Sequence, residues 1–391
     1  MQVLERIGEF ANREMPANIL AFCFLLFIAV LISHHPEYDD WDIFAYVGVA
    51  LRYSGVQADQ IHSATLHIMQ QFLPPAYWDL LTGHGSVDPE FRQAVAANGN
   101  AFMAQLPFYY VKPVYPMLMA LLYAEGVDLP DAGMAISAAA YFGFGLLLYL
   151  WFRRWMPPLV ACITMALITL NPYLVAMGRT IGPDMLSDLA IVLAGFLMIE
   201  HRRLALASAV ILLAAVLIRP ENILYAGVFL IYMAWTSSLR LPWLGVFLVG
   251  TAAIYLLLTR ISGNYGWQTQ FVYSFVNKMA TPVAEHHGVW YYVAAYMGRI
   301  DRILFGSGEL PIFALVAFGT LCLKSAKSQV WADRYVHLVL IGFALAAARM
   351  IVLPTEAARG LLPVYMLLAV AFVEACSELM AVSSTLLENP R

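Results

Sequence analysis

The stretch ILAFCFLLFIAVLISHHPEYDDWD, residues 19–42, contains the two features that decide the fold of this chain. Its first part, residues 19–32, is apolar without interruption, which is typical of a helix that lies in lipid. Its last part, residues 39–42, carries the carboxylates of Asp39, Asp40 and Asp42. A hydrophobic helix that leads directly into an acidic cluster predicts a membrane protein with polar chemistry at the bilayer surface.

The composition of the whole chain agrees with this prediction. Hydrophobic residues make up 61% of the 391 residues, charged residues make up only 12%, and the mean hydropathy is +0.71. A water-soluble domain of this length does not have enough polar surface to cover so much apolar material. An all-α polytopic membrane protein is therefore expected. The net charge of -4 provides no basic field for a phosphate backbone, so nucleic acid is not expected as a partner.

The hydrophobic segments define the expected spans. A spanning helix needs about 20 mostly apolar residues. About ten segments approach this length, namely residues 17–33, 132–152, 158–175, 184–200, 204–219, 222–238, 241–259, 309–323, 335–353 and 360–377. The first segment lacks a small-residue cleavage pattern at its end, which favours a retained helix over a signal peptide.

Basic residues between the spans predict the orientation. On this path they fall on the side of the N-terminus, where we expect the cytoplasm because cytoplasmic loops are enriched in Lys and Arg. They are Arg153, Arg154, Arg202, Arg203, Arg240, Lys324, Lys327 and Arg334. The two long loops, residues 34–131 and 260–308, then lie on the outer side of the membrane, which favours a bacterial inner-membrane location with a periplasmic site.

The first outer loop has the pattern of folded structure. Apolar residues recur at helical spacing after Asp42, which predicts an amphipathic helix lying along the membrane. They are Ile43, Phe44, Val47, Ala50 and Leu51. Residues 112–122 are apolar but short and rich in Pro, which predicts an interfacial helix that returns to the bilayer. Because the chain has no internal repeat and no low-complexity linker, residues 1–391 are expected to form a single membrane domain.

The acidic cluster has two interpretations. One carboxylate could cap the following helix, because a negative charge interacts favourably with the positive end of the helix dipole by about 0.3–1 kcal/mol. Three carboxylates within four residues repel one another, so Asp39, Asp40 and Asp42 favour a site that receives a cation, a sugar hydroxyl or a proton.

Polar residues at the expected outer turns also have two interpretations each. Asp184 follows Gly182-Pro183 as a helix start would, whereas Asp188, one turn deeper, would be costly in an apolar helix unless it faces a cavity. Arg219 and Arg359 could stabilise helix C-termini or hold a phosphate through paired hydrogen bonds. Glu356 could pair with Arg359.

Three residue classes carry weaker signals. The aromatic residues of the second loop are typical of a belt at the lipid headgroups, although aromatic faces also bind sugar rings. The pairs His34-His35 and His286-His287 do not make a metal site by themselves. The four cysteines lie in or beside hydrophobic runs without metal-ligand spacing and are expected to be packing residues. An acidic cluster can work with or without a divalent cation, so a cation cofactor stays open.

At this point the residues resemble a known family, the GT-C superfamily of membrane glycosyltransferases. The first likeness is a first helix followed by a long outer loop that opens with an acidic residue and continues with Tyr, Ala and Gly, here Asp42, Tyr46, Ala50 and Gly55. Later segments also match in order: Lys112-Pro113 with Tyr115-Pro116, Asn171-Pro172, Pro183-Asp184, Arg219-Pro220-Glu221 and Ala358-Arg359-Gly360-Leu361-Leu362-Pro363. The chain departs from the family pattern at Gly360, where an aromatic residue is common.

The resemblance implies transfer of a sugar from a polyprenyl-phosphate carrier to a lipid, glycan or protein acceptor on the outer face. It implies that Asp42, or otherwise Asp40, is the base that deprotonates the acceptor, while Arg219 and Arg359 hold the departing phosphate. Inversion is expected, because a single carboxylate that acts as a base forms no glycosyl-enzyme intermediate. Further substrate contacts are expected from Asp39, Lys112, Arg179, Asp184 and Glu221. Two alternatives remain, a flippase for a lipid-linked precursor and a noncatalytic membrane assembly subunit.

Overall fold

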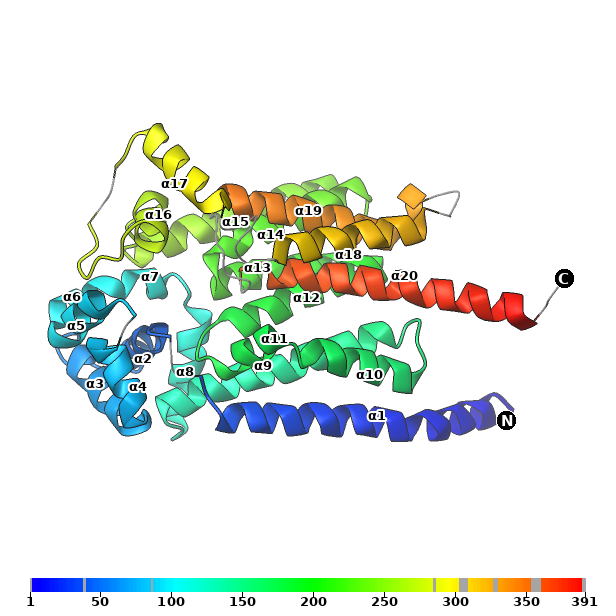
Figure 1. Cartoon of the computed structure of the whole chain (residues 1–391), viewed down its shortest axis with the longest axis horizontal. Coiled ribbons are helices and arrows are strands. Elements are labelled where there is room, and N and C mark those ends of the chain that lie inside the picture. The colour runs from blue at the N-terminus through cyan, green and yellow to red at the C-terminus, as the bar shows by residue number, and fades with distance from the viewer. Residues whose placement is uncertain are drawn as a thin grey trace.

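The computed structural model describes residues 2–37, 40–85, 87–283, 286–301, 309–325, 330–352 and 360–388. Within these ranges all regular structure is helical and no strand is present. Figure 1 shows a bundle of long helices and, at one end of it, a group of short helices, which we call the head. The N- and C-termini lie at the opposite end of the bundle.

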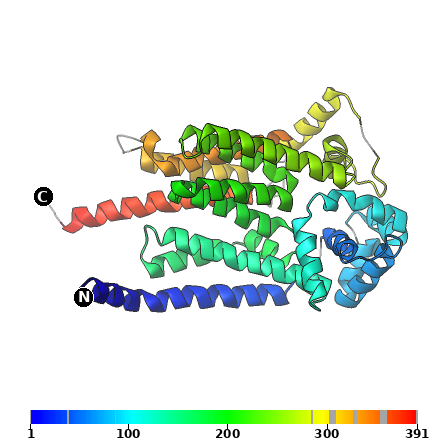
Figure 2. The same ribbon diagram turned by 180° about the vertical axis from the view of Figure 1, so that it is seen from behind.

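The bundle contains the long apolar segments of the chain. Its helices are α1 (Gln2–His34), α9 (Leu129–Phe152), α10 (Pro158–Thr169), α11 (Pro172–Arg179), α12 (Asp184–Glu200), α13 (Ala205–Ile218), α14 (Ile223–Trp235), α15 (Leu241–Ile261), α18 (Glu309–Lys324), α19 (Arg334–Val352) and α20 (Leu362–Glu388). Figure 2, the view from behind, shows that α1 lies at the edge of the bundle. The buried apolar side chains of these helices form one continuous core.

Five described helices are long and apolar enough to cross a membrane: α1, α9, α15, α19 and α20. The pair α10 and α11, bent by 70°, would make a sixth if it is one broken span. Other expected spans form shorter helices, such as α13 with 14 residues and α14 with 13 residues. At about 1.5 Å per residue these two are shorter than a hydrocarbon core of roughly 30 Å. The described residues thus contain helices at all ten expected segments, of which five or six have the length and hydropathy of a span.

The head is built from the first long loop and has a core of its own. Its helices are α2 (Asp42–Tyr53), α3 (Ile61–Phe72), α4 (Pro75–Asp79), a π-helical turn (Leu80–His84), α5 (Pro89–Ala97), α6 (Gly99–Gln105), α7 (Pro107–Tyr110) and α8 (Val114–Ala124). The helix expected over residues 112–122 corresponds to α8, which joins the head to α9 of the bundle.

The prediction of an amphipathic surface helix after Asp42 is wrong for α2. All nine residues from Ile43 to Leu51 are buried, so the helix has no polar face. The residues between the expected apolar positions are Ala45, Tyr46, Gly48 and Val49, which carry no charge and are buried as those positions are. At Gly48, for example, a Cβ atom would lie 2.9 Å from the ring of Phe102 in α6, so the missing side chain lets the two helices approach.

The second long loop contributes α16 (Trp267–Phe275) and α17 (Val289–Asp301), which lie at the head end of the bundle (Figure 1). The segment after α16 is fixed to the head, because Gln105 Nε2 donates to the carbonyl oxygens of Met279 at 3.0 Å and Ala280 at 2.8 Å. The rings of Phe108 and Tyr273 also stack, with centroids 4.8 Å apart. The two long loops therefore form one structure.

Basic residues collect at the other end of the bundle. Arg153 Nη2 lies 2.6 Å from Glu14 Oε2, and Glu200 Oε2 lies 3.5 Å from Arg154 Nε and 3.1 Å from Arg334 Nη1. Several of the arginines on which the expected orientation depends are therefore at the end of the bundle remote from the head. The pattern of Lys and Arg predicts that this remote end faces the cytoplasm.

Gly145 of α9 offers a test of how closely α1 packs on the bundle. A Cβ atom at this position would overlap Leu25 Cδ2 of α1. Gly145→Val is therefore expected to lower the free energy of unfolding by about 1–3 kcal/mol, because α1 or Leu25 must shift. Thermal unfolding in a non-ionic detergent measures the change. The matched control is Gly227→Val in α14, where no heavy atom lies within 4 Å. Equal losses in both variants would contradict the proposed close packing.

Candidate functional site

Asp42 and Asp40 have different surroundings at the start of α2. The hydroxyl of Tyr109 in α7 donates a hydrogen bond to Asp42 Oδ1 at 2.5 Å. Asp40 Oδ1 instead accepts from the backbone N–H of Asp42 at 3.0 Å. Such a contact two residues along is a local cap of the helix start. Asp40 thus forms a hydrogen bond to the backbone, whereas Asp42 is oriented by a side chain from another part of the head.

Tyr109 remains a hydrogen-bond donor at any ordinary pH. Burial raises its pKa well above the usual value, and the neighbouring carboxylate of Asp42 raises it further. The neutral hydroxyl therefore keeps its proton and holds one oxygen of Asp42 in place.

Lys112 packs against two tyrosines near this carboxylate. Its Nζ lies 3.3 Å from the hydroxyl of Tyr46 and over the rings of Tyr46 and Tyr109, 5.8 Å and 5.3 Å from their centroids. Cations are attracted to aromatic faces at this distance. Lys112, which was expected to contact substrate, therefore packs on the ring of the tyrosine whose hydroxyl donates a hydrogen bond to Asp42.

Arg219, Asp184 and Glu221 form one buried ion cluster. Arg219 is 8% exposed at the end of α13 and pairs with Asp184 Oδ1 at the start of α12. It also donates from Nη2 and Nε to Glu221 Oε1, at 2.5 Å and 2.9 Å. Three predicted residues therefore meet, but the guanidinium already has two protein carboxylates as partners. An anionic ligand at Arg219 would have to replace one of them.

Glu221 shows which cations surround the cluster. It lies in the turn Pro220–Asn222 between α13 and α14. Burial by itself would raise its pKa, but the charges of Arg219, Lys112 and Arg349 outweigh burial and hold the pKa of Glu221 well below its usual range. Lys112 from the head and Arg349 from α19 are therefore close enough to act on the same carboxylate.

A turn of the bundle lies between the two groups of charges. A Cβ atom at Gly182 would lie 3.8 Å from Tyr46 Cε2 and 3.4 Å from Asp184 Oδ2. Tyr46 is the ring on which Lys112 sits, and Asp184 is the partner of Arg219. We call the start of α2 with Asp40 and Asp42 the acidic entrance of the head. The acidic entrance and the ion cluster of the bundle therefore lie on either side of Gly182, where a larger residue would fill the space.

A small polar cavity lies below the cluster, with an accessible volume of about 10 Å³. This is about the room that one water molecule needs. Residues from α12, α13, α14, α19 and the start of α20 line it, namely Ser187, Asp188, Arg219, Glu221, Asn222, Tyr225, Arg349, Gly360 and Pro363. Asp188 is 3% exposed, and its Oδ2 accepts no hydrogen bond from any residue that the structure describes. Of the two interpretations of this region, a cavity beside Asp188 is therefore the one that the lining residues favour.

Arg179 contacts the backbone of the segment that precedes the acidic cluster. Its Nε donates to the carbonyl oxygen of His35, and its own carbonyl oxygen accepts from the backbone N–H of Glu37 at 3.1 Å. Arg179 therefore joins α11 to the chain that leaves α1. Asp39 and Arg359 lie outside the described residues.

The sequence interpretation missed Arg349 and Tyr109. Arg349 had a signal, because it interrupts an apolar run inside an expected span, and such cations are rare and usually functional. Tyr109 had none, because an aromatic triplet such as Phe108-Tyr109-Tyr110 is typical of any buried core or membrane interface.

In the parts of the chain with described coordinates, no three His, Cys, Asp or Glu side chains are grouped as metal ligands. No family model, no curated protein and no solved structure matches the chain. The function of the site must therefore be inferred from its own geometry.

Proposed function

We propose that the protein is a membrane glycosyltransferase of the GT-C type that transfers a sugar from a polyprenyl-phosphate donor to a lipid, glycan or protein acceptor. One observation carries the proposal: a carboxylate oriented by a neutral donor, Asp42, lies at the same junction as Lys112, Arg219 and Arg349. Displacement of a lipid phosphate needs a base for the nucleophile and positive charge where the leaving group becomes negative.

In the proposed reaction Asp42 accepts the proton of the acceptor hydroxyl. The hydroxyl oxygen forms a bond to the anomeric carbon, and the bond between that carbon and the phosphate oxygen breaks. The electron pair leaves with the polyprenyl phosphate, whose charge is stabilised by Lys112, by Arg349 and by Arg219, at which the phosphate replaces one carboxylate partner. Because the carboxylate acts as a base and forms no glycosyl intermediate, the anomeric configuration is inverted.

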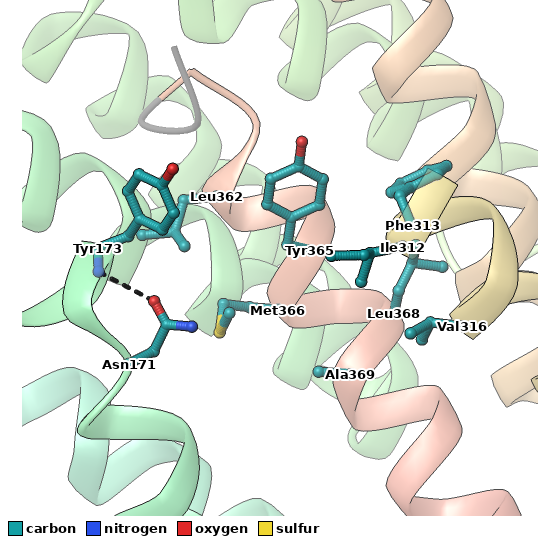
Figure 3. A pocket seen from close by; sticks show the side chains of 10 residues that line it. All are labelled: Asn171, Tyr173, Ile312, Phe313, Val316, Leu362, Tyr365, Met366, Leu368 and Ala369. Atoms are coloured by element: carbon teal, nitrogen blue, oxygen red, sulfur yellow. Dashed lines mark hydrogen bonds between the residues drawn. The ribbon is translucent and has the colours of Figure 1, made fainter. Parts of the chain in front are cut away.

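An apolar groove supports a donor with a lipid chain. It has a volume of about 260 Å³ beside the break between α10 and α11. Figure 3 shows Asn171 and Tyr173 on one side, Ile312, Phe313 and Val316 of α18 on the other, and side chains of α20 between them. Leu362 lines the groove, whereas Gly360 and Pro363 line the polar cavity. The start of α20 therefore lies between the apolar groove, which suits the hydrocarbon chain of the donor, and the polar cavity beside the charged residues.

The proposal includes a topology. The ten helical segments cross or enter the bilayer, the N-terminus and the arginine-rich end face the cytoplasm, and the head lies on the outer face of a bacterial inner membrane. The polyprenyl donor and membrane lipids are the proposed partners.

A flippase for a lipid-linked precursor is the second candidate, and Asp188 with Arg349 favours it. Both side chains are buried in apolar helices, at 3% and 5% exposure, and buried charges within a membrane bundle often mark a transport path. The charges of the site nevertheless collect at one end of the bundle, which favours surface chemistry over transport.

The purified protein in lipid nanodiscs, given a radiolabelled polyprenyl-phosphate sugar and candidate acceptors, tests the enzyme. Labelled product is expected with an acceptor that carries a free hydroxyl. The same protein in sealed vesicles tests the alternatives: label that crosses the bilayer without forming a new bond identifies a flippase. Neither product nor movement with any acceptor would contradict both candidate functions and favour an assembly subunit.

Tyr109→Phe tests how Asp42 is held. The substitution removes one hydrogen bond to a charged group, worth about 1.5–3 kcal/mol, so the transfer rate is expected to fall by about tenfold or more. The KM for the donor should change little, and the acid limb of the pH–rate profile should move to higher pH, because the carboxylate loses a bond that favours its charged form. Tyr110→Phe, which changes the adjacent hydroxyl, is the matched control. An equal loss in both variants would contradict the orienting role of Tyr109.

A further inference from the structure

A second polar cavity lies at the end of the bundle that is remote from the head. It has a volume of about 560 Å³ and is lined by Ile199, Glu200, His201, Arg202, Arg203, Leu204 and Arg334. α12 begins at Asp184 in the candidate site and ends at Glu200 in this cavity. At about 1.5 Å per residue the two places are roughly 24 Å apart. The cavity is therefore separate from the site described above.

The cavity carries an excess of positive charge. Its carboxylate, Glu200, is already neutralised, because Oε2 pairs with Arg334 at 3.1 Å and Arg154 at 3.5 Å, while Oε1 accepts from Trp151 and Tyr335. Arg202 and Arg203 are exposed, and neither forms an ion pair with a carboxylate among the residues described here. Two exposed guanidinium groups of the lining thus have no carboxylate partner among the described residues.

Two helices also begin at this cavity. α13 starts at Ala205, directly after Leu204, and α19 starts at Arg334. The N-terminal end of a helix carries a partial positive charge and backbone N–H groups without helical partners. The start of α19 is already capped, because Asp333 Oδ1 accepts from the backbone N–H of Tyr335 at 2.8 Å. The start of α13 adds to the attraction that the arginines exert on an anion, and phosphate is the anion that guanidinium groups bind with paired hydrogen bonds.

An apolar surface continues from the rim of the cavity along α13. Leu204, Leu206 and Val210 are 46%, 48% and 53% exposed, and Leu206 and Val210 lie four residues apart on one face of the helix. A free phosphate ion would make no use of this surface, whereas an acyl chain would cover it.

We propose that this cavity binds the headgroup phosphate of an anionic phospholipid, with an acyl chain along the exposed face of α13. The position fits, because the cavity lies at the end of the apolar bundle, where lipid headgroups reside, and basic pockets between membrane helices are suited to anionic headgroups. The occupant is a membrane lipid and differs from the proposed donor, which binds at the head.

The test measures lipid bound to the full chain in a non-ionic detergent by native mass spectrometry. Separate titrations use phosphatidylglycerol, phosphatidylcholine with the same acyl chains, and inorganic phosphate. Phosphatidylglycerol is expected to bind saturably and more tightly than the other two. Arg202→Gln with Arg203→Gln should weaken phosphatidylglycerol binding by about thirtyfold, because each arginine near an anionic headgroup contributes about a fivefold factor. Arg202→Lys with Arg203→Lys should retain most of the affinity.

The matched control is Arg240→Gln with Arg260→Gln, which removes the same charge from exposed positions outside the cavity. This variant should bind phosphatidylglycerol as the unchanged protein does. An equal loss in both double variants would overturn the proposal in favour of diffuse attraction. Equal binding of both lipids, or binding of inorganic phosphate as tight as that of phosphatidylglycerol, would also overturn it.

Discussion

Asp42→Asn is expected to reduce the rate of sugar transfer by about 10²–10⁴-fold, which is the usual contribution of a general base. Asn has the shape of Asp and can still accept the hydrogen bond that Tyr109 donates to Asp42 Oδ1, so the local geometry should persist. What the variant loses is the negative oxygen that receives the proton. The rate of radiolabelled product formation in nanodiscs measures this loss, and the unfolding midpoint should stay close to that of the unchanged protein.

Asp40→Asn and Asp59→Asn are the controls for this prediction. Asn at position 40 can still accept from the backbone N–H of residue 42, as Asp40 Oδ1 does at 3.0 Å, so the rate should change by less than about threefold. Asp59 is exposed, elsewhere in the head, and should have no effect. A large loss in Asp40→Asn with normal activity in Asp42→Asn would assign the base to Asp40. Full activity in both variants would exclude the acidic entrance from the chemistry.

Arg219→Gln is expected to lower the free energy of unfolding by about 3–5 kcal/mol, the usual consequence of removing one partner of a buried ion pair. The side chain is 10% exposed and pairs with Asp184 and Glu221, so the substitution leaves two largely buried carboxylates without their common guanidinium. Thermal unfolding in detergent measures the effect. Arg52→Gln, at an exposed position of α2, should change the stability by less than about 0.5 kcal/mol.

The pH dependence of stability distinguishes this variant from the unchanged protein. In the unchanged protein the pKa of Glu221 is held below its ordinary value of 4.5 by Arg219, Lys112 and Arg349 against the effect of burial. Its ionised form therefore stabilises the fold above about pH 4.5, and this contribution is lost as the pH falls further. Arg219→Gln should instead gain stability on acidification from pH 7 to pH 5, because protonation neutralises the carboxylates that remain.

A double variant provides the decisive comparison. Adding Glu221→Gln to Arg219→Gln removes one of the carboxylates left behind, so it should restore part of the lost stability. If instead the change in the free energy of unfolding of the double variant equals the sum of the changes in Glu221→Gln and Arg219→Gln, the two side chains are not coupled, and their ion pair contributes little to stability.

The helical class of the chain and several members of the site could be predicted from local sequence. Apolar runs such as residues 19–32 dictate helices because a backbone in lipid must satisfy its own hydrogen bonds. Asp184, Arg219 and Glu221 stand out because charges beside apolar helices are costly and need partners. The approach of Asp184 to the other two could not be predicted, because Asp184 begins α12 whereas Arg219 and Glu221 lie in the turn after α13, and nothing in the local pattern says which helix ends meet.

What the sequence by itself determined is therefore a helical chain with segments apolar enough to cross a membrane and with acidic and basic residues at the ends of its helices, since these properties follow from hydropathy and charge along the chain. Only the tertiary structure decided that Tyr109 orients Asp42, that Lys112 and Arg349 act on Glu221, and that residues 43–51 of α2 are all buried. These features depend on contacts between segments far apart in the chain, and the packing of whole helices, rather than any local preference, sets such contacts.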